Sequence, residues 1–243
     1  MDGVLTVARR PRPDGPAPRL VATRIPAGAV GVVLVLHGGG GAGAVPVSPM
    51  QLAVLRMEPT ALGIARAGRG RVVVYRLLNA VRGLGSDPLS NVRWALEQAG
   101  RDHPGLPVCL IGHSLGGSVA LAAAAEPGVR GVVALAPWLS GSESTRQLQA
   151  SPTLIAHGRN DRITSCQASR QYAERARGDG APVSFVEVAR GEHTMLRRAP
   201  VFDLLAARYA VALLDRGNAV RRTRSRLGRL AVATLDEPGD YPI

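Results

Sequence analysis

The chain has 243 residues, of which 46% are hydrophobic and 20% charged, a composition that suits one globular domain with a sizeable core. Its formal net charge is +12 and all 30 basic residues are arginine, but they are scattered and only 3% of residues are aromatic, so we expect no nucleic-acid partner. No apolar run is long enough to span a membrane, and two cysteines are too few for a disulfide framework or a zinc site.

The N-terminal segment, residues 3–26, alternates apolar and polar residues on both sides of a proline-rich stretch. This pattern predicts edge strands at 4–7 and 19–25, joined by a loop. The chain begins Met1-Asp2-Gly3, without the basic and then apolar stretch of a secretory leader. We therefore expect a cytoplasmic location.

From residue 31 onward, short runs of valine, leucine and isoleucine alternate with helical patterns, which is typical of parallel βαβ units. The runs lack polar alternation, as expected of strands covered by helices on both faces. The predicted strands are 31–36, 71–77, 107–111, 130–135, 153–156 and 182–188, and the predicted helices are 59–67, 90–102, 115–125, 166–177 and 197–215. We predict a single α/β domain over residues 1–215 with a mostly parallel central sheet.

Residues 216–243 form a tail of different composition. Six arginines lie among residues 216–229, and the acidic segment Asp236-Glu237-Pro238-Gly239-Asp240 follows. We predict that an amphipathic helix in this tail docks poorly on the domain or frays.

The segment Gly112-His113-Ser114-Leu115-Gly116 matches G-x-S-x-G, which places a nucleophilic serine on a sharp strand-to-helix turn. Because so short a motif also occurs by chance, the flanking structure decides whether it marks a nucleophile. Here a predicted strand precedes the motif and a predicted helix follows it, as such a turn requires. A serine hydroxyl is a weak nucleophile that needs a base, itself oriented by a third group. Ser114 is therefore the candidate nucleophile.

The candidate acid and base follow later strands, at the carboxyl ends where open α/β sheets build their sites. Asp161 comes after strand 153–156 and His193 after strand 182–188, which gives the chain order Ser, Asp, His. A turn or capping role for Asp161 and a surface-loop role for His193 remain the alternatives. The rivals fit less well because of their placement: His103 precedes the serine, His157 lies too close to its strand, and Asp179 and Asp203 lie at a helix end and inside a helix.

A glycine-rich loop, His37-Gly38-Gly39-Gly40-Gly41, follows strand 31–36 and leaves its backbone N–H groups unobstructed. We expect the N–H groups of Leu115 and Gly39 to form an oxyanion hole, with Gly40 as a substitute for Gly39. The same glycines fit a dinucleotide-binding G-x-G-x-x-G with Glu58 downstream, but nearby prolines prevent a helix from starting at the loop and Glu58 lies outside any predicted strand.

These motifs, HGGG, GHSLGG and the late Asp–His pair, resemble those of the α/β-hydrolase superfamily over residues 31–215, and more narrowly its small esterases and dienelactone-hydrolase-like members. The resemblance implies the α/β-hydrolase fold and cleavage of a small carboxylic ester through an acyl-enzyme on Ser114, with His193 as base and Asp161 as the orienting acid. It implies no cofactor and no metal. Superfamily members often insert a lid after the strand that follows the nucleophile helix. Only residues 138–150 are available here, so we predict no lid, an open site and short acyl groups.

Other functions remain open on the same residues. A thioesterase, lactonase, amidase or acyltransferase would use the same triad, and a non-enzymatic binding protein could share the fold. Trp138 follows a predicted strand end and either walls the acyl pocket or packs against the short connection. The sequence does not indicate an oligomeric state.

Overall fold

The computed structural model describes residues 16–39, 45–82, 87–217 and 225–243. In this part of the chain an eight-stranded sheet has the order β1-β4-β2-β6-β7-β8-β9-β10. Its strands are β1 Arg19–Arg24, β2 Gly31–Leu36, β4 Val72–Leu78, β6 Val108–His113, β7 Val129–Leu135, β8 Thr153–Gly158, β9 Val183–Val188 and β10 Asp240–Pro242. Among the described strands of this sheet only β1 runs antiparallel to its neighbour, and a separate antiparallel pair joins β3 Val45–Pro46 to β5 Val81–Arg82.

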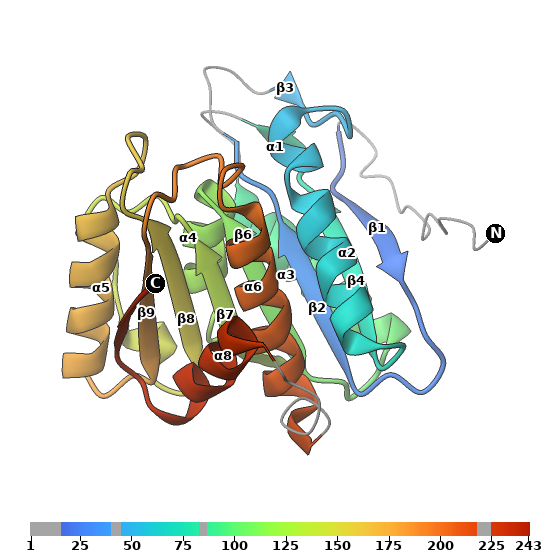
Figure 1. The fold of residues 1–243 in the computed structure, drawn as a ribbon. Helices are drawn as coiled ribbons and strands as arrows, with labels where there is room; N and C mark the ends of the chain where they lie inside the picture. The colour runs from blue at the N-terminus through green and yellow to red at the C-terminus, as the bar shows by residue number, and fades with distance from the viewer. Residues whose placement is uncertain (1–15, 40–44, 83–86, 218–224) are drawn as a thin grey trace.

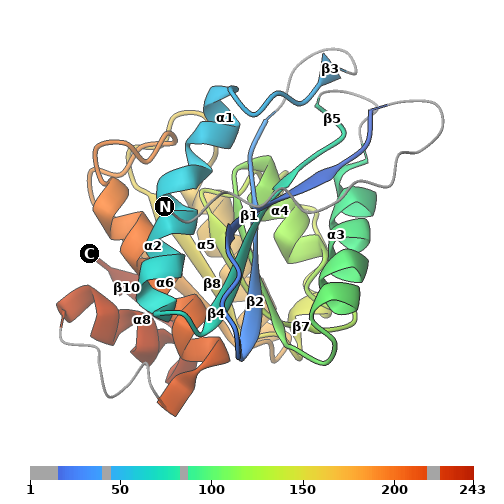
Figure 2. The same cartoon turned by 90° about the vertical axis from the view of Figure 1, so that its right-hand side faces the viewer.

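Helices cover both faces of the sheet (Figures 1 and 2). One face carries α2 Met57–Gly68, α6 Ala199–Leu214 and α8 Arg226–Asp236. The other carries α3 Pro88–Asp102, α4 Leu115–Ala122 and α5 Cys166–Gly178. A short α1, Leu52–Leu55, precedes α2, and the one-turn 3₁₀ helix η1, Arg146–Leu148, lies between β7 and β8.

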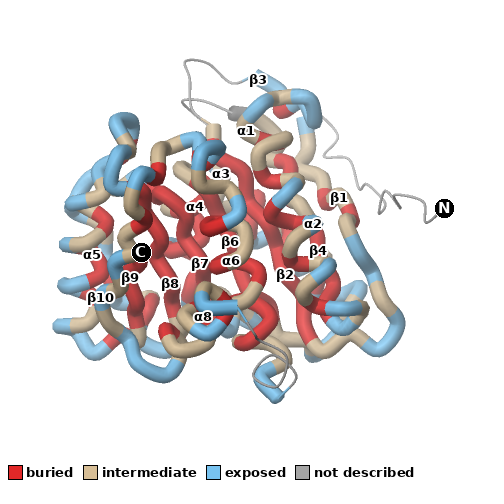
Figure 3. The backbone as a smooth tube through the Cα atoms, in the orientation of Figure 1, coloured by how far each residue is buried: buried red, intermediate tan, exposed pale blue. Residues whose placement is uncertain are grey.

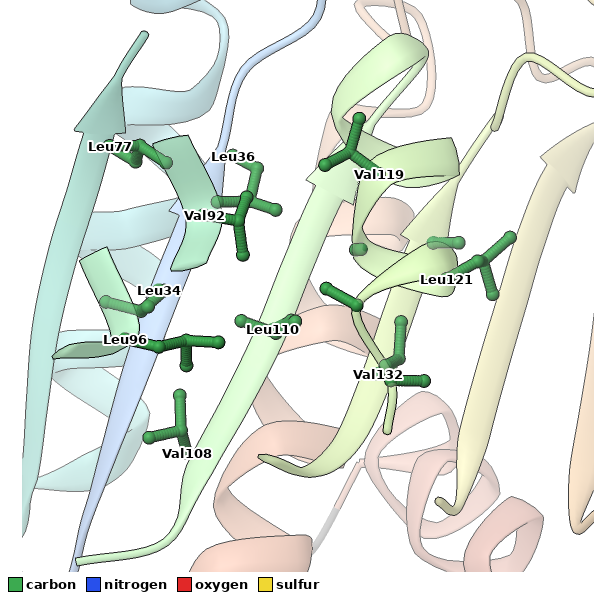
Figure 4. Packing of buried hydrophobic residues seen from close by; sticks show 14 of the residues in the cluster. Leu34, Leu36, Leu77, Val92, Leu96, Val108, Leu110, Val119, Leu121 and Val132 are labelled. Atoms are coloured by element: carbon green, nitrogen blue, oxygen red, sulfur yellow. The ribbon is translucent and has the colours of Figure 1, made fainter. Parts of the chain in front are cut away.

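The two hydrophobic cores follow from strand geometry, because successive side chains of a strand point to opposite faces. In β2, Val33 and Val35 belong to the core under α2 and α6, whereas Leu34 and Leu36 belong to the core under α3 and α4. Figure 4 shows this second core from close by, and Figure 3 shows that the strands are buried along most of their length. Burial on both faces explains the uninterrupted apolar runs.

The predicted fold, a mostly parallel sheet with helices on both faces and no lid, is confirmed. The connection between β7 and β8 contains only η1 and no inserted domain. The strand predicted at 19–25 is β1, and the strand predicted at 4–7 lies outside the described residues. Helix ends differ from the predictions by a few residues: α2 begins at Met57 and α4 ends at Ala122.

The prediction that the C-terminal tail docks poorly was wrong. Helix α8 packs against α6 and buries Ala231 completely, and β10 extends the sheet as a parallel neighbour of β9. The acidic end of the tail is held by α5, where guanidinium groups of Arg170 and Arg177 lie 3.3 and 2.9 Å from the Asp240 carboxylate. The arginine count suggested a solvated tail, but the apolar face of α8 decides where the segment lies.

Deletion of residues 225–243 should destabilise the domain. It would uncover the edge of β9 and the flank of α6, and would remove apolar side chains such as Leu227, Leu230 and Ala231 from the core. Burial of one large apolar side chain contributes about 1.5–3 kcal/mol. The melting temperature of the truncated chain should therefore fall by roughly 10 °C or more, or the chain should aggregate. Circular dichroism melting and size-exclusion chromatography measure both, and a monomeric truncated chain with an unchanged melting temperature would contradict the expectation.

Candidate active site

Ser114 stands on a strained turn between β6 and α4. Its backbone has φ 55° and ψ −122°, a conformation that side-chain-bearing residues rarely adopt. The turn is held on both sides: the Ser114 N–H donates to the Leu135 carbonyl at 3.0 Å, and the Gly117 and Ser118 N–H groups donate to the Ser114 carbonyl at 2.9 and 3.1 Å. This turn sits at the carboxyl edge of the sheet, which is uppermost in Figure 1.

The glycines of the motif are required by close contact. A Cβ atom on Gly112 would lie 2.0 Å from the Gly116 carbonyl oxygen. A Cβ atom on Gly116 would lie 2.6 Å from the carbonyl oxygens of Leu36 and His37. The turn therefore packs directly against the end of β2, where the glycine-rich loop begins.

The structure brings the three predicted residues Ser114, His193 and Asp161 together. His193, in the loop between β9 and α6, has its Nε2 atom 3.1 Å from Ser114 Oγ. Its Nδ1 atom lies 2.8 Å from Asp161 Oδ2, in the loop between β8 and α5. An ionised carboxylate can only accept, so Nδ1 carries the proton and Nε2 is free to accept the proton of the Ser114 hydroxyl.

The Asp161 carboxylate is fully buried but well supplied with donors. The backbone N–H groups of Ile163 and Thr164 donate to Oδ1 at 2.8 and 2.9 Å, and the Thr164 hydroxyl lies 2.8 Å from Oδ2. Burial by itself would raise the pKa of Asp161, but hydrogen bonds from His157, His193 and the two backbone N–H groups hold it well below its usual range. The group is therefore a carboxylate at any pH at which an imidazole base works.

His157 is a residue of this network whose role the sequence analysis missed. It is fully buried near the end of β8, and its Nε2 atom lies 3.2 Å from Asp161 Oδ2. Its Nδ1 atom lies 2.8 Å from Ser169 Oγ on α5, so the Ser169 hydroxyl donates to Nδ1 while Nε2–H donates to Asp161. The signal was present in the sequence, as a histidine directly after the predicted strand 153–156 and four residues before Asp161.

His113, the chain neighbour of Ser114, anchors the loop of His193. Its Nε2–H donates to the His193 carbonyl at 2.8 Å, and burial lowers the pKa of His113 to about 4, so the ring is neutral. A second hydrogen bond joins the loops that carry Asp161 and His193, because the Gly191 carbonyl accepts the Asn160 N–H at 2.9 Å.

Of the glycine N–H groups expected to form the oxyanion hole, that of Gly39 belongs to the described residues and that of Gly40 does not. Burial lowers the pKa of His37, which favours the neutral ring. The Nε2 atom of this ring accepts the Asn79 N–H at 3.2 Å, and its Nδ1–H donates to the Gly38 carbonyl at 2.5 Å. Because a trans peptide points its N–H opposite to its C=O, the Gly39 N–H is directed away from His37. Leu115 opens α4, so its N–H has no carbonyl partner within the helix.

The rival residues from the sequence are engaged elsewhere. His103 Nε2 lies 2.8 Å from the Tyr75 hydroxyl, and Glu58 pairs with Arg76 at 3.3 Å. Asp203 accepts from the Thr60 hydroxyl at 2.5 Å, and Asp179 accepts from the Thr145 hydroxyl.

Apolar side chains stand exposed on the loops around the site. Trp138 is 54% exposed, so more than half of its surface is not packed against the connection after β7. Ile163 and Leu196, on the loops of Asp161 and His193, are 71% and 66% exposed. In the described part of the chain no group of three or more histidine, cysteine or acidic residues is arranged to hold a metal ion, and no helix there is long and apolar enough to cross a membrane.

The family model of PET hydrolase-like proteins, the PETase family, matches residues 99–220, which is half of the chain and includes Ser114, Asp161 and His193. The chain belongs to the PET hydrolase-like family. None of the curated proteins matches the sequence.

Solved structures share the fold of this PET hydrolase-like chain. An α/β serine hydrolase homologue from Coxiella burnetii is 19% identical, with a TM-score of 0.60 over 85% of this chain and 99% of that chain. XC6422 from Xanthomonas campestris, described as a serine hydrolase without a lid, is 21% identical, with a TM-score of 0.59 over 90% and 94%. The esterase Pf2001 from Pyrococcus furiosus is 15% identical, with a TM-score of 0.62 over 82% and 87%. These similarities establish the α/β-hydrolase fold.

Proposed function

We propose that the chain is a serine hydrolase that cleaves a small carboxylic ester, with Ser114 as nucleophile, His193 as base and Asp161 as the orienting acid. One observation carries the proposal: a line of hydrogen bonds runs from Asp161 Oδ2 to His193 Nδ1 at 2.8 Å and from His193 Nε2 to Ser114 Oγ at 3.1 Å. Membership of the PET hydrolase-like family supports an ester as substrate, because its name refers to a polyester.

Acylation begins when Ser114 Oγ attacks the ester carbonyl carbon and its proton passes to His193 Nε2. The negative charge that develops on the carbonyl oxygen is stabilised by the N–H groups of Leu115 and Gly39. Asp161 stabilises the imidazolium without taking its proton, since its pKa is held far below that of an imidazole. When the tetrahedral intermediate collapses, the bond to the alcohol oxygen breaks and His193 gives that oxygen the proton.

Deacylation repeats the sequence with water. His193 takes a proton from a water molecule, which attacks the acyl carbon and forms a second oxyanion in the same hole. The carboxylic acid leaves and Ser114 recovers its proton. In the described part of the chain no inserted domain covers the site, so we expect short acyl groups rather than long chains that need a walled pocket.

A labelling experiment and a substrate panel test this function. A fluorophosphonate probe should label the protein at Ser114, since it reacts with an activated serine. p-Nitrophenyl acetate and butyrate should be cleaved faster than the octanoate and faster than matched thioesters, and bis(2-hydroxyethyl) terephthalate tests the aromatic esters that the family name suggests. Absence of both labelling and hydrolysis in folded protein would refute an activated serine. Labelling together with faster cleavage of thioesters would support Ser114 as the nucleophile but show that the substrate is a thioester.

We expect His157→Phe to lower kcat about tenfold with little change in KM. The substitution removes one donor from the Asp161 carboxylate, and a hydrogen bond to a charged group contributes about 1.5–3 kcal/mol. It also leaves the Ser169 hydroxyl unpaired in a buried position, so the free energy of unfolding should fall by about 1–3 kcal/mol. Steady-state kinetics and urea unfolding measure the two effects. Ser169→Ala serves as a partial control that keeps the donor to Asp161, and equal kcat for His157→Phe and the wild type would show that the second histidine does not matter to the acid.

A further inference from the structure

Next to His193 the surface is hollowed over about 420 Å³ by the loops between β8 and α5 and between β9 and α6. Three arginines line the hollow: Arg162 on the first loop and Arg190 and Arg197 on the second. Glu192 is the one acidic residue among the described residues that line it. The three arginines and the one glutamate of the wall leave two positive charges in excess.

These positive charges are largely uncompensated. In the part of the chain that the structure describes, Arg162 and Arg190 form no ion pair, and Arg197 has its Nε atom 3.6 Å from Glu192 Oε2 while its side chain is 81% exposed. Arginines just outside the hollow differ in this respect, since Arg56 pairs with Asp203 and Arg159 pairs with Glu187. The hollow therefore presents guanidinium groups that are available to an anion.

The backbone under the hollow is fixed. The Asn160 N–H donates to the Gly191 carbonyl at 2.9 Å, and Gly158 and Gly191 lie so close that a Cβ atom on Gly158 would be 2.3 Å from the Gly191 carbonyl carbon. Arg190 is held at φ 58°, in the left-handed region that a residue with a side chain enters only at a cost. The two loops thus hold Arg162 and Arg190 on a common frame beside the base.

We infer that this hollow binds a carboxylate carried by the alcohol part of the ester substrate. The inference rests on the proposed function, in which His193 returns the proton to the alcohol oxygen, and His193 lines the hollow. The inference accordingly places the alcohol part on the side of His193 on which the arginines lie. A guanidinium group matches the geometry of a carboxylate and binds it through two parallel hydrogen bonds.

A matched pair of substrates tests the inference. 4-Acetoxybenzoate carries a carboxylate on its alcohol part, and 4-acetoxybenzamide carries a neutral amide at the same place. The measured quantity is the ratio of kcat/KM for the benzoate to kcat/KM for the benzamide. In the double variant R162Q/R190Q this ratio should fall by about fivefold to tenfold, mainly through KM for the benzoate, as expected for loss of two exposed charges. In the wild type the ratio should also fall as salt is raised from about 0.02 to 0.5 M, because screening weakens exposed charge pairs.

The control is the double variant R66Q/R130Q, which removes the same charge from exposed arginines on α2 and at the start of β7. Its ratio should equal that of the wild type. A ratio that falls equally in both double variants would overturn the inference in favour of the general positive field, and a ratio unchanged in R162Q/R190Q would overturn it outright. Both outcomes require cleavage of the benzamide, so they differ from failure of the proposed function, in which neither ester is cleaved and the fluorophosphonate does not label.

Discussion

Ser114→Ala should lower kcat/KM for the best ester about 10³-fold or more and leave the melting temperature close to that of the wild type. Ala removes only the hydroxyl, and the turn is held by backbone hydrogen bonds and by glycine contacts that the substitution does not touch. The residual rate is that provided by substrate binding and the oxyanion hole. Steady-state kinetics on p-nitrophenyl butyrate and thermal melting check both expectations.

Ser142→Ala is a suitable control, because Ser142 lies on the exposed segment after β7 and its hydroxyl contacts Ser140. Its kinetics and its labelling by the fluorophosphonate should match those of the wild type. If Ser114→Ala retains most of the activity in a preparation free of contaminating esterases, another residue is the nucleophile.

Asp161→Asn should lower kcat by about 10⁴-fold, the second-largest effect that we expect. An amide can present its NH₂ group to His193 Nδ1, which puts the imidazole proton on Nε2, where it can no longer accept the proton of Ser114. An amide also provides no charge to stabilise the imidazolium. Combined with Ser114→Ala, the loss should be far smaller than the product of the two single losses, because the residues act as one unit. Multiplicative losses would show that Asp161 acts independently of the nucleophile.

The same substitution should change how stability depends on pH. The pKa of Asp161 in the folded protein is held well below the value of about 3.9 in an unfolded chain. The carboxylate therefore stabilises the fold fully above that value, and the stabilisation is lost as the pH falls below it. The difference in free energy of unfolding between wild type and Asp161→Asn should be largest near pH 7 and shrink toward pH 3, as measured by urea unfolding. A difference that is constant over this range would mean that the pKa of Asp161 is the same in the folded and the unfolded chain.

The central sheet could be predicted from the sequence because each inner strand is buried on both faces and so reads as one apolar run. Ser114, Asp161 and His193 could be selected because strand ends define where site residues lie in such a sheet, and their roles stay predictions until the kinetics are measured. The position of β10 could not be predicted, since Asp240-Tyr241-Pro242 has no strand pattern and is ordered by β9 and by arginines of α5. The contact of His157 with Asp161 could not be predicted, because the order of Ser, Asp and His along the chain does not reveal which other buried side chains contact the carboxylate.

Libraries that aim at new substrates should leave Gly112 and Gly116 unchanged. A Cβ atom on either glycine would lie 2.0 to 2.6 Å from backbone carbonyl oxygens, so most variants at these positions would be lost to misfolding before any selection for activity. Diversity is better placed on Trp138, Ile163 and Leu196, whose side chains project into solvent from loops around the site. Around Ser114, the two glycines of the turn are therefore fixed by backbone contacts, whereas the exposed loop positions can vary without loss of the fold.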